Sequence, residues 1–251
     1  MVSSTRLLSV NQANRLAIRD AFLARGVTHL HYMAPLRTMG LIAAVGIISY
    51  NIRQRLAQDP EQQKMMRDLG CESLADPNVQ FRRDRKAVFG RNLHDYVPLY
   101  IGRFTPMQYV VTKNNFDKQG ELIAFAEVSV EKLFELEGLC YSDGNAASNA
   151  TRFYNDPSGL EAIEWDIVLH ENRCWNREWR RWKMAEVLVP DRIPPECIDY
   201  YVLKDSESAE EFCEWLDELI ERDAITHTNF ATVWDQPYFY RLVGGSLIPN
   251  D

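Results

Sequence analysis

The chain lacks the features of a membrane, exported or disulfide-stabilised protein. Its longest apolar run, residues 39–48, is too short to cross a bilayer, and residues 1–15 have no continuous apolar stretch or small-residue cleavage site. The five cysteines are scattered and form no CxxC pair. We therefore expect a cytoplasmic protein with reduced cysteines, no zinc site and no association with a membrane.

The motifs of the common nucleotide-binding and hydrolytic families are also absent. No GxGxxG, Walker loop, HExxH or GxSxG occurs, and there are no internal repeats, low-complexity tracts or linkers. The chain has 251 residues, of which 46% are hydrophobic and 25% charged. This composition predicts a single globular domain over residues 1–251.

Periodicity and turn residues predict short strands that alternate irregularly with helices, which indicates an α+β fold and not a doubly wound sheet. Pro98 predicts an edge or bulged strand, Thr105 and Pro106 predict a helix start, and Ser208 with Glu211 predicts a capping box. Residues 51–92 predict short helices and a mobile loop, and a helical turn is expected up to residue 154. Helices are expected at residues 11–25, 35–44, 107–111, 129–136 and 208–223, and strands at 28–33, 47–49, 96–101, 121–128, 187–189, 200–203 and 226–234.

Charge is unevenly distributed along the chain. The net charge is −8, but residues 204–223 hold nine acidic and two basic residues, so the remainder is close to neutral. A single charge run is usually a solvated face, whereas two basic clusters in an acidic protein favour an anionic ligand. The clusters are Arg82, Arg83, Arg85, Lys86 and Arg91, and then Arg173, Arg177, Arg180, Arg181 and Lys183.

Three residues are candidates for chemistry, and each also has a structural interpretation. Glu186 leads into an apolar strand behind five basic residues, where it either forms an ion pair with Arg180 or Lys183 or serves a reaction. Arg83 offers a rigid donor fork for phosphate or carboxylate, or it is solvated. His31 lies on a predicted strand, where a histidine is more often a hydrogen-bond partner than a catalyst.

The run His94-Asp95-Tyr96-Val97-Pro98-Leu99-Tyr100-Ile101 is followed by Thr105-Pro106-Met107-Gln108-Tyr109. This run and three further blocks of sequence together resemble the DarT family of DNA ADP-ribosyltransferase toxins, whose signature is HDYVPFYF…SPMLY. The other blocks are His31-Tyr32-Met33 with Gly40 and Gly46, then Val79-Gln80-Phe81-Arg82-Arg83, and Lys183-Met184-Ala185-Glu186-Val187-Leu188-Val189. The resemblance spans residues 28–203, and residues 1–27 look like an N-terminal helical extension.

The resemblance implies an α+β fold with an ADP-ribosyltransferase-like split mixed β core and surrounding helices. It implies NAD⁺ as co-substrate without a metal, Glu186 and Arg83 as catalytic residues, and His31, Met33, Gly40 and Arg83 as NAD⁺ contacts. Residues 33–38 depart from the family pattern. A macrodomain antitoxin of the DarG kind is implied as a partner.

The expected acceptor is a base of single-stranded DNA, and both thymine and guanine remain open. Tryptophans that stack on bases and arginines that meet phosphates are typical of single-strand binding. The tryptophans at positions 175, 179 and 182 could equally form one buried helix face. The predicted DNA-binding residues are Arg82, Trp175, Arg177, Trp179, Arg180 and Arg181.

Other functions share some of these residues. An ADP-ribosyltransferase that modifies protein or RNA ends would use the same NAD⁺ chemistry. A non-enzymatic nucleic-acid-binding module would need only the basic clusters, and a metal nuclease would use Asp84, Asp95 and Glu186.

Overall fold

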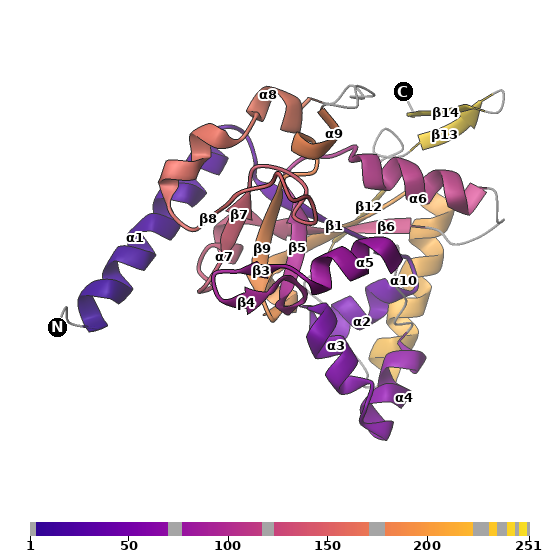
Figure 1. Ribbon diagram of the computed structural model, residues 1–251. Coiled ribbons are helices and arrows are strands. Elements are labelled where there is room, and N and C mark those ends of the chain that lie inside the picture. The colour runs from indigo at the N-terminus through magenta and orange to yellow at the C-terminus, as the bar shows by residue number, and fades with distance from the viewer. Residues whose placement is uncertain are drawn as a thin grey trace.

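The computed structural model describes residues 4–69, 77–116, 123–170, 179–222, 231–234, 240–243 and 246–249. The helices are α1 (Ser4–Leu23), α2 (Thr38–Val45), α3 (Tyr50–Leu56), α4 (Pro60–Asp68), α5 (Pro77–Asp84), α6 (Pro106–Phe116), α7 (Val130–Leu133), α8 (Trp165–Val168), α9 (Trp179–Trp182) and α10 (Ser206–Glu221), with 3-10 turns η1 (Leu93–Asp95), η2 (Pro157–Ala162) and η3 (Pro195–Cys197). The strands are β1 (His29–Pro35), β2 (Ile47–Ile48), β3 (Ala87–Val88), β4 (Arg91–Asn92), β5 (Tyr96–Tyr100), β6 (Ile123–Ser129), β7 (Cys140–Ser142), β8 (Phe153–Tyr154), β9 (Glu186–Pro190), β10 (Arg192–Ile193), β11 (Ile198–Leu203), β12 (Ala231–Trp234), β13 (Tyr240–Val243) and β14 (Ser246–Pro249). The predicted α+β class is confirmed (Figure 1).

An eight-stranded sheet in the order β12-β11-β6-β1-β5-β9-β7-β8 forms the centre of the molecule. Its pairs are antiparallel apart from β11 with β12, so the sheet is mixed. Strand β1 pairs with β6 over seven positions and β5 pairs with β9 over five, but β1 and β5 are registered only at His31 and Tyr100. The sheet is therefore split between two well-paired halves.

Pro98 lies inside the sheet, so its predicted edge position is wrong. The N–H of Ile101 donates to Ala185 on the β9 side, and backbone groups alternate along a strand. The nitrogen of Pro98 therefore faces β1, at a position where β1 and β5 are no longer registered. A proline is tolerated there because no ladder bond is lost.

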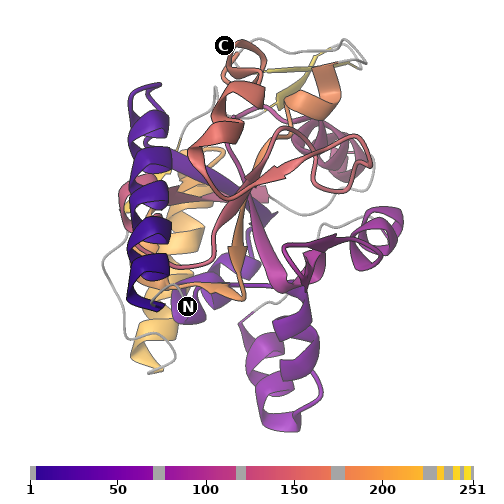
Figure 2. The same cartoon turned by 60° about the vertical axis from the view of Figure 1, so that its left-hand side comes forward.

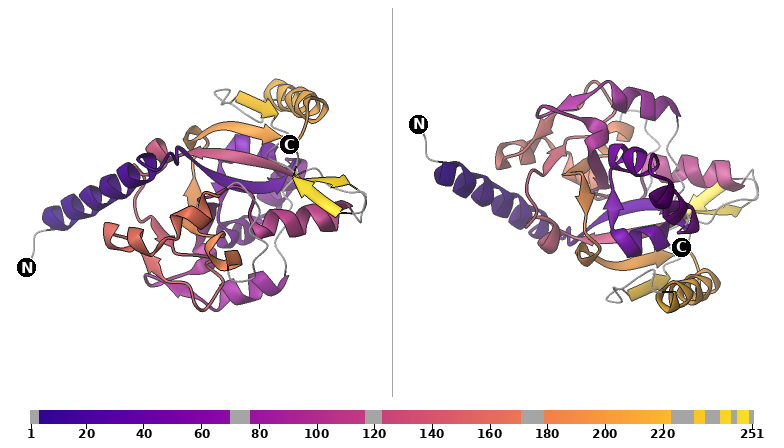
Figure 3. Two further views of the ribbon diagram at one scale, coloured as in Figure 1. Left: turned by 90° about the horizontal axis from the view of Figure 1, so that it is seen from above. Right: turned by 90° about the horizontal axis from the view of Figure 1, so that it is seen from below.

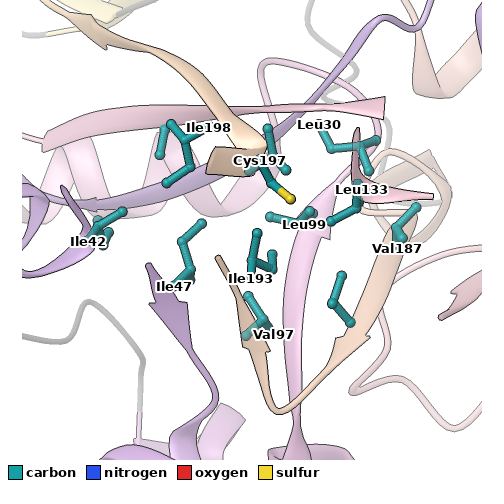
Figure 4. Packing of buried hydrophobic residues seen from close by; sticks show 14 of the residues in the cluster. Leu30, Ile42, Ile47, Val97, Leu99, Leu133, Val187, Ile193, Cys197 and Ile198 are labelled. Atoms are coloured by element: carbon teal, nitrogen blue, oxygen red, sulfur yellow. The ribbon is translucent and has the colours of Figure 1, made fainter. Parts of the chain in front are cut away.

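One face of the sheet packs on the main apolar core. Alternate strand residues such as Leu30, Leu99 and Val187 pack with Ile42 of α2 and Leu133 of α7 in one cluster, shown in Figure 4. The opposite face carries α6, whose Val111 packs with Phe125 and Val202. Polar side chains on this second face point away from the main apolar core.

The N-terminal helix belongs partly to the core and partly to the surface. Phe22 is fully buried and its ring contacts the rings of Phe134, Tyr141 and Trp165. The first turns of α1 project away from the sheet (Figure 3). The helix hairpin of α3 and α4 also extends from the body (Figure 2). None of the helices in the described part of the chain is long and apolar enough to span a membrane.

Several predicted element boundaries need correction. The helix predicted from Pro35 begins at Thr38, because Pro35 ends β1 opposite Ile123. The capping residue of α10 is Asp205, whose carboxylate accepts the N–H of Ser208, and not Ser208 itself. The turn predicted up to residue 154 is strand β8. The helix predicted at residues 11–25 begins at Ser4, and the helix predicted at 107–111 extends to Phe116. The remaining predicted elements have counterparts within a few residues in the described part of the chain.

Candidate active site

The face of the sheet that carries α6 also carries a row of four polar side chains, which belong to Glu127, His31, Tyr100 and Glu186. His31 pairs with Glu127 of β6 and Tyr100 of β5, and Tyr100 pairs with Glu186 of β9. Directly paired residues of antiparallel strands project to the same face, and neighbouring strands lie about 4.8 Å apart. The row therefore brings together residues that are far apart in the sequence, at the place where the sheet is split.

Hydrogen bonds hold both the carboxylate and the backbone N–H of Glu186, and only 2% of the residue is exposed. Its Oε2 accepts from Nη1 of Arg83 at 3.2 Å, and its Oε1 accepts from the N–H of Ala146 at 3.1 Å. Its backbone N–H donates to Oγ of Ser142 at 3.1 Å, and this hydroxyl donates to the carbonyl of Gly144. The carboxylate is thus fixed in position. The ion pairs predicted with Arg180 or Lys183 are replaced by one with Arg83.

Arg83 reaches Glu186 from α5. The helix is placed by Nε2 of His94, which donates to the carbonyl of Gln80 at 3.0 Å. Among the described residues, Nη2 of Arg83 is buried and has no hydrogen-bond partner. A buried donor without a partner is costly, which indicates that a ligand oxygen belongs there. Arg83 can therefore join the carboxylate of Glu186 to an oxygen-rich substrate.

A cavity of about 170 Å³ lies between β1 and β5 and is bordered by Arg83. We call it the β1–β5 cavity. It is lined by Met33 and Pro35 of β1, by Pro98 and Tyr100 of β5, and by residues of α3, α5 and α6. Arg53 and Arg83 both border it, together with the aromatic residues Tyr50 and Tyr100. Aromatic surfaces with two cations suit a nucleotide that carries phosphates.

Burial shifts the ionisation of groups around the site. It lowers the pKa of His94, and the charge of Arg83 lowers it further, against the bond to Gln80. It raises the pKa of the Tyr100 phenol, and the charge of Glu186 raises it further. His94 is consequently held neutral near pH 7, and Tyr100 keeps its proton as a potential hydrogen-bond donor.

The predicted NAD⁺ contacts fall in three different places. Met33 lines the β1–β5 cavity with Arg83. His31 lines a second cavity of about 290 Å³, while its Nδ1 bonds to Glu127 at 2.8 Å. Gly40 borders neither cavity. A Cβ placed on it would lie 2.4 Å from the Trp215 ring of α10. The structure gives Gly40 a packing role between α2 and α10.

The predicted DNA-binding residues are likewise divided. Arg82 and Arg180 are exposed, and Trp179 is half-buried. Nη1 of Arg181 bonds to Asp143 at 2.8 Å and so holds the loop that contains Ala146. Trp175 and Arg177 lie outside the described residues.

One side chain of the nuclease hypothesis, that of Asp95, serves the scaffold. Asp95 accepts from Asn51 and from the N–H of Asn92, which fixes η1. Within the described ranges, no group of three or more His, Cys, Asp or Glu residues has an arrangement that could hold a metal ion.

Sequence reasoning missed Ser142, Ala146 and Glu127, which all contact the candidate residues. Ser142 and Ala146 contribute a buried hydroxyl and a backbone N–H, and neither leaves a pattern in the sequence. Glu127 stands in an apolar run, Ile123–Ser129, where a buried carboxylate is unusual. That contrast is a signal that could have identified it.

Comparison with known proteins shows similarity to one family. A family model described as "ssDNA thymidine ADP-ribosyltransferase, DarT" matches residues 57–232. A DNA ADP-ribosyl transferase of Thermus aquaticus is 31% identical over 180 residues, which cover 69% of this chain and 71% of the relative. One of Mycobacterium tuberculosis is 30% identical over 125 residues, or 45% of this chain and 53% of the relative.

Solved structures share the fold at lower identity. Thermus sp. 2.9 DarT in complex with ADP-ribosylated ssDNA has a TM-score of 0.68 at 20% identity, over 86% of this chain and 97% of that one. The same protein in complex with NAD⁺ has a TM-score of 0.64 at 19% identity, over 85% and 98%. Thermosipho africanus DarTG in complex with ADP-ribose has a TM-score of 0.67 at 20% identity, over 84% of this chain and 51% of that chain. The predicted α+β architecture with a mixed β core is confirmed.

Proposed function

Because this chain belongs to the DarT family of single-stranded-DNA ADP-ribosyltransferases, we propose that Glu186 and Arg83 transfer ADP-ribose from NAD⁺ to a thymine base. Membership makes the chain a DNA ADP-ribosyltransferase with NAD⁺ as its co-substrate. The observation that carries the residue assignment is the buried Glu186–Arg83 pair at the split of the sheet. The choice of thymine follows the family's description, and guanine is the alternative base.

In the proposed reaction, the bond between nicotinamide and C1′ of the ribose breaks, and its electron pair leaves on the nicotinamide nitrogen. The ribose passes through an oxocarbenium-like state, as in glycoside hydrolysis. A nitrogen of the base gives its electron pair to C1′, and the proton of that nitrogen is released to water. The reaction needs stabilisation of a positive charge on the sugar, which a fixed carboxylate supplies.

Glu186 is placed to provide that stabilisation. Its carboxylate would accept a hydrogen bond from a ribose hydroxyl and interact most strongly when the sugar carries positive charge, which is selective binding of the transition state. The bonds from Ala146 and Arg83 hold the carboxylate before substrate arrives. No reorganisation is then needed during the reaction.

Arg83 is assigned to binding and orientation. An arginine keeps its proton at neutral pH and is a poor base. Its buried Nη2 would donate to a phosphate or ribose oxygen of NAD⁺, while Nη1 holds Glu186. Met33 would contact the same substrate in the β1–β5 cavity, and His31 would contact it from the second cavity.

Replacement of Glu186 by glutamine tests this assignment. We expect transfer to fall by about 10²- to 10³-fold, because one such electrostatic contact contributes about 2.7–4 kcal/mol to the transition state. Transfer is measured by mass spectrometry of oligonucleotides incubated with NAD⁺, and Glu161→Gln, on the exposed surface, is the matched control. A folded Glu186→Gln protein with a rate within tenfold of wild type would refute the role of Glu186.

The acceptor is tested with four oligonucleotides, each enriched in one base. Label on the thymine-rich strand supports the proposal, and label on the guanine-rich strand replaces thymine by guanine. The same incubation with total protein and with RNA ends tests the two other acceptor classes. Transfer to either of those, without transfer to DNA, would refute the proposed acceptor.

We also propose that the protein acts as a toxin in the cytoplasm. A macrodomain protein that removes ADP-ribose would neutralise it. Thermosipho africanus DarTG supports a partner of the DarG kind. Expression of the active chain should stop bacterial growth, and co-expression of an ADP-ribose-removing macrodomain should restore it. Growth arrest by Glu186→Gln as strong as by wild type would contradict this role.

A further inference from the structure

Two exposed phenylalanines stand close to Arg83 in the sequence. Phe81 on α5 is 54% exposed and Phe89 in the β3–β4 turn is 52% exposed. Among the residues whose side chains the structure describes, only Val110, at 48%, is a further large apolar residue with such exposure. Both rings come from residues 77–92, which we call the α5–β4 segment.

The α5–β4 segment is basic in an acidic protein. It contains five basic residues and one acidic residue, whereas the whole chain has a net charge of −8. Arg82 and Arg85 are exposed, and Arg83 points inward to Glu186. A cationic segment with exposed aromatic rings matches an unpaired nucleic-acid strand, whose phosphates and base faces need those two kinds of partner.

Phe81 lies on the side of α5 that faces away from Glu186. Residues two apart on a helix point in nearly opposite directions, so Phe81 and Arg83 occupy different faces. The guanidinium carbon of Arg85 lies 3.9 Å from the centroid of the Phe81 ring. A base stacked on Phe81 would be within about one helix diameter, ~10–12 Å, of Arg83.

Phe89 occupies a backbone position that phenylalanine disfavours. Phe89 and Gly90 form the two-residue turn of the β3–β4 hairpin, with φ of 47° and 81°. Turns with two positive φ angles favour Asn-Gly, and a bulky residue there is strained. The chain thus presents an exposed ring at a cost in backbone conformation. Retained strain of this kind points to function.

We propose that Phe81 and Phe89 stack on bases that flank the acceptor base of single-stranded DNA, while Arg82 and Arg85 bind the phosphates between them. This inference rests on the proposed function and adds the surface that holds the strand. The two rings act as positioning groups, and the chemistry remains with Glu186 and Arg83.

The variants Phe81→Ala and Phe89→Asn test the stacking. Their dissociation constants for a labelled 16-nucleotide single strand are measured without NAD⁺, followed by the KM for DNA and for NAD⁺. We expect each variant to weaken DNA binding by about 5- to 100-fold, the effect of one lost base–aromatic stack. The KM for NAD⁺ should change far less than the KM for DNA. Phe81→Trp should retain affinity, and Val110→Ala is the matched exposed apolar control.

Salt dependence separates stacking from phosphate contacts. Loss of one phosphate contact reduces the slope of log affinity against log salt concentration by about 0.7 for a single strand. Arg82→Ala and Arg85→Ala should reduce the slope, whereas Phe81→Ala and Phe89→Asn should leave it unchanged. Phe89→Asn also suits the turn, so its expected stability is equal to or higher than that of wild type and misfolding does not obscure the result.

Wild-type protein that modifies single-stranded DNA, with unchanged affinity in both phenylalanine variants, would overturn this inference and leave the proposed function intact. Wild-type protein that does not modify DNA would overturn the proposed function itself. Equal weakening by Val110→Ala would also overturn the inference, because it would show a general effect of apolar surface.

Discussion

Replacement of Ser142 by alanine is expected to impair catalysis without removing any group that touches substrate. The hydroxyl of Ser142 is fully buried, accepts the N–H of Glu186 at 3.1 Å and donates to the carbonyl of Gly144 at 2.7 Å. The change leaves that N–H buried without a partner. Glu186 and the loop after Gly144 then lose the group that joins them.

The stability cost follows from the unpaired donor. A buried N–H without a partner costs about 1–3 kcal/mol. For a chain of this size, each kcal/mol corresponds to about 2–4 °C in melting temperature, so we expect a decrease of about 2–12 °C. A displacement of Glu186 approaching 1 Å can reduce the rate by as much as about 10²-fold, so we expect kcat to fall by about 10- to 100-fold. The KM for NAD⁺ should change less.

Thermal unfolding and steady-state transfer to oligonucleotides measure the two effects separately. Ser208→Ala is the control, because Ser208 is also buried and its hydroxyl bonds to Asp205 at 2.6 Å, at the start of α10 and outside the site. It should lose stability with unchanged kcat. If the kcat of folded Ser142→Ala stayed within twofold of that of Ser208→Ala, the positioning role of Ser142 would be refuted.

Two further predictions concern Gly40 and His94. Gly40→Ala should destabilise the fold by about 1–3 kcal/mol, because the new Cβ would lie 2.4 Å from the Trp215 ring. An unchanged KM for NAD⁺ in the folded variant would show that Gly40 serves packing and does not contact the substrate. Burial lowers the pKa of His94, so the unfolded chain binds the proton more readily and stability should decrease as pH falls below the ordinary histidine value of about 6.5. Melting temperatures between pH 7.5 and 5.5 should show this decrease, and His94→Gln should flatten it; an equal decrease in the variant would exclude His94 as the cause.

The sequence predicted local structure where one residue dictates one geometry. The hydroxyl of Thr105 accepts the N–H of Gln108 at the start of α6, as the Thr-Pro pair predicted. Gly46 ends α2 with a φ of 80°, which glycine adopts readily. The pairing of distant strands could not be read this way, because apolar alternation defines a strand face without naming its neighbour.

The candidate site shows the same difference between features that local sequence predicts and features that depend on distant segments. Glu186 and Arg83 were predicted from local blocks of sequence, and the structure places their side chains 3.2 Å apart. The prediction that Pro98 marks an edge was wrong because a proline needs only a missing ladder partner, which a split inside the sheet also supplies. Gly40 was predicted as a substrate contact, and its packing against Trp215 of α10 is a feature that spacing along the chain does not reveal.

The single registered contact between β1 and β5 has a mechanical consequence. Strands β12, β11, β6 and β1 form one half of the sheet, and β5, β9, β7 and β8 form the other. In the described chain the two halves are paired in register at His31 and Tyr100. A small rotation of one half against the other would pivot about this pair. It would change the width of the β1–β5 cavity, while the spacing of His31, Tyr100 and Glu186 at the pivot would change least.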